Sequence, residues 1–123
     1  MSDWKEAWMR GLKLHGQADH KGAAEAQKEA LALDPDNVEV MHALAVALMN
    51  AGELDEAAKV GNRIVELAPD DAFAHTTLSI IYQRQDRIDD AEAEGAKARM
   101  KAWKAELKTN PDAPPPQGIN VIQ

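Results

Sequence analysis

The chain lacks cysteine and has few aromatic side chains. Its 123 residues include three tryptophans, one tyrosine and one phenylalanine. The absence of cysteine excludes a disulfide framework and a cysteine-based metal site. No window approaches the roughly 18 consecutive apolar residues that a transmembrane helix needs. With so little aromatic bulk the chain is suited to closely packed helices, and no membrane partner is expected.

Basic residues are also in the minority. Fourteen lysines and arginines stand against 21 acidic residues, which gives a formal net charge of −7. This balance argues against a nucleic-acid partner, because phosphates need a basic face. The segment from Met1 to Glu6 carries charge where a signal peptide would need an apolar run. We therefore expect a cytoplasmic protein.

Residue patterns that carry chemistry are missing as well. The sequence has no phosphate-binding glycine loop and no nucleophile motif. The four histidines, His15, His20, His42 and His75, form no i,i+4 pair and no His-Glu-x-x-His pattern, although His15 and His42 could meet in a groove. We predict no enzyme activity, no metal site and no cofactor.

What the chain does have is alanine and an internal repeat. It contains 23 alanines, the residue with the highest helix propensity. A shift of 34 residues aligns Gly11 with Ala45 and Ser79, Leu14 with Leu48 and Tyr82, Ala23 with Ala57 and Ala91, and Pro35 with Pro69. The small residue, the large residue, the alanines and the closing proline resemble the tetratricopeptide repeat. The resemblance covers about Trp4 to Arg99.

The expected fold is all-α, a right-handed superhelical solenoid of three helix-turn-helix repeats with an extended last helix. Residues 1–109 form the array, with units near 4–37, 38–71 and 72–109, and residues 110–123 form a proline-rich extended tail. Apolar residues at helical spacing predict helices near 4–16, 20–33, 38–50, 54–67, 72–84 and 87–108. Pro35 and Pro69 should end helices, and the residues after them should cap the next ones.

Two features concern the packing of paired helices. Ala23, Ala57 and Ala91 should lie where the paired helices cross, since a larger side chain would force them apart. Gln27, Gly61 and Gly95 stand where the family usually has a bulky residue. Each interior glycine should cost about 1 kcal/mol relative to alanine, with close helix approach as compensation.

The resemblance also implies a binding groove, lined by the first helix of each unit. The positions that it assigns to this groove are Lys5, Trp8, Leu12, His15 and Gly16; Glu39, His42, Val46, Met49 and Asn50; and Phe73, Thr76, Ile80, Gln83 and Arg84. Many are apolar, which favours binding of an apolar peptide or helical segment. The alternative is burial of these side chains against one another or against a terminal segment of the same chain.

One ligand class of the family is disfavoured. Members that bind chaperone C-terminal tails hold two carboxylates with a clamp of lysines, asparagines and an arginine. The matching positions here are Trp8, Leu12, Ala43, Phe73 and Thr77, and none keeps the required donor. We expect no carboxylate clamp of this kind.

The C-terminal part departs from the repeat. Trp103 stands at the position of Pro35 and Pro69, so the last helix should continue to about Lys108. Met100, Trp103 and Leu107 share one face, and the tail ends with large aliphatic residues at Ile119, Val121 and Ile122. The stripe is either a terminal cap or a self-association surface, and the tail either a disordered end or a docking peptide.

We therefore interpret the sequence as a non-catalytic protein-interaction module, an adaptor for a protein or peptide ligand. The alternative is a homo-oligomeric scaffold assembled through the groove, the last helix and the tail.

Overall fold

The computed structural model describes residues 3–116, whose regular elements are six helices in sequence. The elements are α1 (Trp4–Gly16), α2 (His20–Leu33), α3 (Val38–Asn50), α4 (Leu54–Leu67), α5 (Ala72–Arg84) and α6 (Ile88–Leu107). Five helices have the predicted limits, and α6 is one residue shorter at each end. No helix within 3–116 is long and apolar enough to cross a membrane.

Local signals set the limits between units. The side-chain oxygen of Asn37 accepts a hydrogen bond from the backbone N–H of Val40 at 3.1 Å, and Asp71 accepts one from Ala74 at 3.1 Å. These bonds satisfy amide groups that the first turn of a helix leaves unpaired. Pro35 and Pro69 each stand two residues beyond the last residue of a helix. The predicted stops and caps are confirmed.

The turn inside each unit has the same backbone path three times. The backbone N–H of Asp19, Glu53 and Arg87 donates to the carbonyl of Leu14, Leu48 and Tyr82, at 2.9, 2.9 and 2.8 Å. The preceding residue has a left-handed backbone in every unit, with φ of 60° at Ala18, 84° at Gly52 and 60° at Asp86. Only the middle unit has the glycine that this conformation favours.

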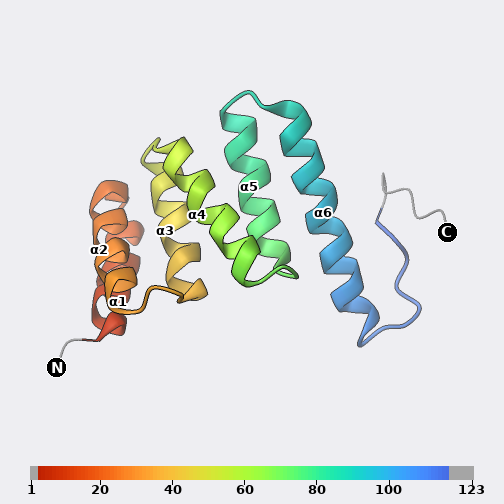
Figure 1. Ribbon diagram of the computed structural model, residues 1–123, viewed down its shortest axis with the longest axis horizontal. Helices are drawn as coiled ribbons and strands as arrows, with labels where there is room; N and C mark the ends of the chain where they lie inside the picture. The colour runs from red at the N-terminus through yellow and green to blue at the C-terminus, as the bar shows by residue number, and fades with distance from the viewer. Residues whose placement is uncertain (1–2, 117–123) are drawn as a thin grey trace.

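The helix pairs stack along the long axis of the molecule (Figure 1). Each helix packs on the next, and α3 also touches α1 and α5. The first helices of the units, α1, α3 and α5, therefore lie next to one another in one layer. This is an all-α helical-repeat fold, as predicted.

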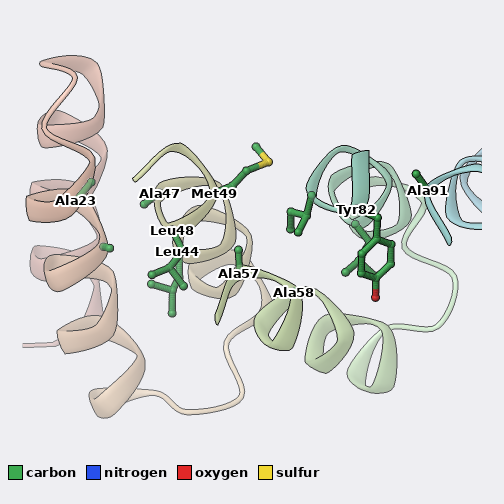
Figure 2. Packing of buried hydrophobic residues seen from close by; sticks show 12 residues of the cluster. Ala23, Leu44, Ala47, Leu48, Met49, Ala57, Ala58, Tyr82 and Ala91 are labelled. Carbon is green, nitrogen blue, oxygen red and sulfur yellow. The ribbon is translucent and has the colours of Figure 1, made fainter. Parts of the chain in front are cut away.

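The core is continuous across the three units, and Figure 2 shows its largest cluster. It joins side chains from five helices: Ala23, Ala24, Leu44, Ala47, Leu48, Met49, Ala57, Ala58, Leu78, Ile81, Tyr82 and Ala91. Ala23, Ala57 and Ala91 are all buried, as expected for residues at helix crossings. Because each buried cluster joins residues of at least two units, no unit has a core separate from its neighbours.

Close packing replaces the missing bulk at two of three positions. A Cβ added to Gly61 would lie 2.8 Å from Cδ2 of Leu78, so α5 approaches this glycine directly. Gln27 is 1% exposed and packs against Gly11, where an added Cβ would lie 2.2 Å from Nε2 of Gln27. At Gly95 the nearest atoms would be 3.4 Å away, an ordinary contact. The expectation of close approach is therefore wrong at Gly95.

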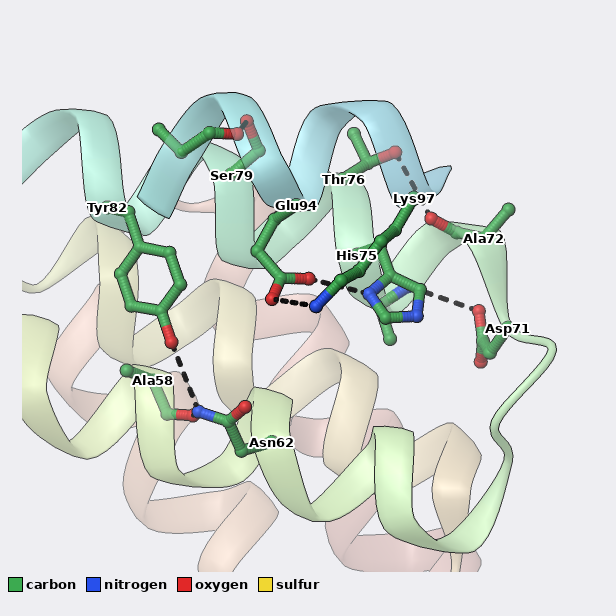
Figure 3. A network of polar contacts seen from close by, with 12 residues as sticks. Ala58, Asn62, Asp71, Ala72, His75, Thr76, Ser79, Tyr82, Glu94 and Lys97 are labelled. Carbon is green, nitrogen blue, oxygen red and sulfur yellow. Dashed lines mark hydrogen bonds and ion pairs between the residues drawn. The ribbon is translucent and has the colours of Figure 1, made fainter. Parts of the chain in front are cut away.

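Polar contacts tie neighbouring helices together (Figure 3). Nδ1 of His75 lies 2.6 Å from Oε2 of Glu94, which joins α5 to α6, and Nδ2 of Asn62 donates to the hydroxyl of Tyr82 at 3.3 Å. On the surface, a hydrogen bond from Lys101 lowers the pKa of Asp70. Such exposed pairs orient helices but contribute little to stability.

The C-terminal segment turns back onto the last helix. Helix α6 has 20 residues against 14 in α2 and α4, and residues 110–116, here called the strap, run back beside it (Figure 1). The indole Nε1 of Trp103 donates to the carbonyl of Ala113 at 2.9 Å, and Ala113 is buried. The strap is therefore a covering segment of the last helix rather than a free extended tail.

Candidate functional site

A hollow of about 280 Å³ opens in the first half of the molecule. Its wall comes from α1, α2 and α3, with one residue from the start of α5. The lining residues are Trp8, Gly11, Leu12, His15, Ala23, Gln27, Glu39, His42, Ala43, Val46 and Phe73. Glu39 is the one carboxylate among them, and none of them is a lysine or an arginine.

The wall of the hollow is mainly apolar. Leu12 is 42% exposed and Phe73 57% exposed, while Val46 and Trp8 are half-buried. The ring of Trp4 packs edge-on against the ring of Trp8, at a centroid distance of 5.7 Å, and so supports its position. Exposed apolar side chains gathered in one concavity are typical of a binding surface.

His42 has a fixed place at the edge of the hollow. Its Nε2 lies 2.6 Å from Oδ2 of Asp71, the residue whose other carboxylate oxygen caps α5. The ring of Phe73 packs edge-on against the imidazole at 5.1 Å. The N-cap residue Asp71 and the first-turn residue Phe73 of α5 thus both contact His42 of α3 and fix its position.

The hollow brings together some of the expected groove residues but not all of them. Seven line it: Trp8, Leu12, His15, Glu39, His42, Val46 and Phe73. Lys5, Gly16, Asn50, Thr76, Ile80, Gln83 and Arg84 lie outside it. Met49 is 8% exposed and belongs to the core, so its side chain is unavailable as a surface anchor, contrary to expectation.

Gly11, Ala23 and Gln27 also line the hollow, although they are not among the expected groove residues, and so does Ala43, which the sequence marked only as a clamp position. Two of them belong to α2. The alignment of Gly11 with Ala45 and Ser79 did mark a small residue there. Small residues hollow out the wall because they leave space that a larger side chain would fill.

The histidines lie in two places within residues 3–116. His15 and His42 line the same hollow, and the rings of His15 and His20 lie 5.4 Å apart. No group of three or more histidine, aspartate and glutamate side chains in this part of the chain could hold a metal ion.

The residues expected at a self-association surface differ in exposure and in the contacts they make. Trp103 is engaged by the strap, and Met100 and Leu107 are half-buried. Trp103 also forms a small concavity with Pro114 and Pro116. Ile119, Val121 and Ile122 lie outside the described residues.

Comparison with known proteins decides the family. The sequence pattern described as "Tetratricopeptide repeat" matches residues 14–76, just over half of the chain. The chain belongs to the tetratricopeptide repeat family. This family is generally a non-catalytic protein-interaction fold. No curated protein matches the sequence.

Solved structures of the family have the same fold. MamA is 19% identical, with a TM-score of 0.79 over 85% of this chain and 61% of MamA. YrrB, described as a TPR protein with an unusual peptide-binding site, is 23% identical, with a TM-score of 0.77 over 91% of this chain and 54% of YrrB. The chain thus spans less than two thirds of either protein.

A third structure contains a ligand. The second TPR of Spaghetti (RPAP3), bound to the HSP90 peptide SRMEEVD, is 15% identical, with a TM-score of 0.73. The match covers 79% of this chain and 90% of that one. At these identities the likeness concerns the fold.

Proposed function

We propose that the protein is an interaction module that binds an apolar peptide or helical segment of a partner in the hollow between α1, α2, α3 and α5. The observation that carries this proposal is the exposure of Leu12 and Phe73 on the wall of a mainly apolar concavity. Side chains of this kind gain free energy when a partner removes them from water, at about 25 cal/mol per Å² of apolar surface. The proposal includes no catalytic role.

The neighbours support binding in general but not one ligand. YrrB is described by its peptide-binding site, and the RPAP3 domain holds an HSP90 peptide. In this chain four positions of the carboxylate clamp, Trp8, Leu12, Ala43 and Phe73, line the hollow and carry no amide or cationic side chain. We infer that apolar contact replaces recognition of a terminal carboxylate.

The proposal is tested with a double substitution, Leu12→Glu together with Phe73→Glu. Both side chains are exposed, so the fold should persist while two buried charges penalise any apolar ligand. Peptides selected from a displayed random library on the wild-type protein should bind the variant at least tenfold more weakly, measured by fluorescence polarisation.

The matched control is Met9→Glu together with Ile88→Glu. These side chains are 63% and 51% exposed and lie outside the hollow. The control should bind the selected peptides like the wild-type protein. Equal binding by the Leu12 and Phe73 variant, with its helical circular dichroism intact, would contradict the proposed site.

The homo-oligomeric scaffold stays a second hypothesis. It needs the last helix and tail to contact another copy, whereas the strap of the same chain occupies Trp103. Sedimentation over a concentration series separates the two, because a strict monomer excludes the scaffold.

A further inference from the structure

The hollow combines an apolar wall with a carboxylate that has no ion-pair partner among residues 3–116. Glu39 is exposed on the first turn of α3, and the salt bridges of this part of the chain do not include it. It is the one side chain of fixed charge that lines the hollow, since the carboxylate of Asp71 contacts His42 but is not part of the lining. A ligand that fills the hollow therefore meets a single negative charge at the wall.

Two buried polar atoms of the wall lack hydrogen-bond partners among residues 3–116. Nε2 of Gln27 donates to the carbonyl of Trp8 at 3.0 Å, so the buried Oε1 of Gln27 is left without a donor. The buried Nδ1 of His42 has no partner either. Both atoms are buried, so a ligand in the hollow meets apolar surface at this part of the wall.

The volume of the hollow leaves room for an anchor larger than a single ring. At about 280 Å³ it is nearly twice the roughly 150 Å³ of an apolar cavity that binds benzene. A fused bicyclic side chain therefore fits in size. Tryptophan is the side chain with such a body, and its single polar atom, an N–H at the ring edge, can stay at the open side of the hollow. Lysine or arginine in the hollow itself would place a charge against apolar walls, which is costly.

We propose that the hollow takes a tryptophan side chain from a partner segment with lysine or arginine beside it, the basic group pairing with Glu39. This inference rests on the proposed function, because it names the ligand chemistry of the same site. An acidic flanking residue, or a terminal carboxylate, would be repelled by Glu39.

The test uses three capped tetrapeptides: Gly-Trp-Lys-Gly, Gly-Trp-Glu-Gly and Gly-Ala-Lys-Gly. Each is titrated into the full-length protein at low ionic strength, and backbone amide shifts in α1 and α3 are followed by NMR. The Trp-Lys peptide should bind about fivefold more tightly than the Trp-Glu peptide. This preference should shrink in an assay at 0.5 M salt, where the Debye length is about 4 Å. The Ala-Lys peptide should bind weakest, since it lacks the anchor.

The role of Glu39 is tested with the variant Glu39→Gln, and Glu6→Gln is its matched control. Both glutamates lie in the first turn of the first helix of a unit, so both changes remove the same favourable interaction with a helix N-terminus. Glu39→Gln should abolish most of the preference for lysine over glutamate, whereas Glu6→Gln should keep it. Thermal melting by circular dichroism checks that both variants fold.

The outcomes separate the inference from the proposed function. Equal binding of the Trp-Lys and Trp-Glu peptides overturns the flanking charge but leaves an apolar site in place. Tightest binding by the Ala-Lys peptide overturns the tryptophan anchor. If no peptide shifts the amides of the hollow, the inference fails, and the proposed function fails with it when library peptides also do not bind.

Discussion

Residues 27, 61 and 95 have the same place in the second helix of each unit, yet each meets a different neighbour. Gln27 packs on Gly11, Gly61 on Leu78, and Gly95 lies at ordinary distance from Ser79 and Arg99. The 34-residue spacing shows that these positions correspond, because that information is in the sequence. The neighbour comes from another helix, so its distance cannot be derived from the spacing.

Gly61 and Gly95 should therefore respond in opposite ways to substitution by alanine. Gly61→Ala places a methyl group 2.8 Å from a carbon of fully buried Leu78, and the overpacking should outweigh the gain in helix propensity. We expect the free energy of unfolding to fall by about 1 kcal/mol. Gly95→Ala has room and should raise it by about 0.5–1 kcal/mol.

Urea denaturation of the two variants beside the wild-type protein measures both changes. Since the positions are equivalent in the repeat, each variant is the control of the other. A stabilising Gly61→Ala would mean that Leu78 moves aside at little cost.

At the scale of the element, local chemistry determines where helices begin and end. Proline and the capping residues act within a few positions, which is why the helix limits beside Pro35 and Pro69 follow from the sequence. Whether the side chain at a given repeat position is exposed does not follow from the sequence in this way. His15 and Gln83 are exposed, while Met49 at the same repeat position is buried, because α3 has neighbours on both sides.

The extension of the last helix contacts the strap of the same chain. Residues 102–107 of α6 have no counterpart in α2 or α4, and Trp103 in this extension holds the strap. The sequence predicted the longer helix and the apolar stripe. It left open what covers them, because a tail of prolines has no periodic pattern that indicates a docking surface.

Removal of the indole donor should loosen the strap. Trp103→Phe keeps an aromatic ring but loses the hydrogen bond to Ala113, a net contribution of about 1 kcal/mol. Hydrogen exchange at the Ala113 amide, which donates to Asn110 at 3.0 Å, should then speed up by roughly fivefold. Exchange in the core of α3 should stay unchanged.

Trp4→Phe is the control, because Trp4 lies at the other end of the molecule, in contact with Trp8. It should leave exchange at Ala113 as in the wild-type protein. Unchanged exchange in Trp103→Phe would show that prolines and backbone bonds alone hold the strap.

For the whole molecule, stability depends on contacts between units. Met41, Ile64 and Ala74 form one buried cluster although they belong to α3, α4 and α5, and the largest cluster reaches from α2 to α6. In a solenoid each unit buries its apolar face only against its neighbours. The repeat in the sequence predicted this dependence, since one amphipathic pair cannot cover itself.

A chain cut after Pro69 should therefore be largely unfolded. The cut removes α5 and α6, and with them Leu78 and Ile81, so buried Leu48 and Ile64 would face water. Loss of burial for each such side chain costs about 1.5–3 kcal/mol, against a total stability of only about 5–15 kcal/mol for a small domain. Circular dichroism of the fragment should show little helix and no cooperative thermal transition.

A second chain that ends at residue 109 lacks only the last part of the molecule and keeps all six helices, so it should melt cooperatively. A cooperative transition in the shorter fragment would instead mean that two units suffice, and that the third is present for the ligand rather than for the fold.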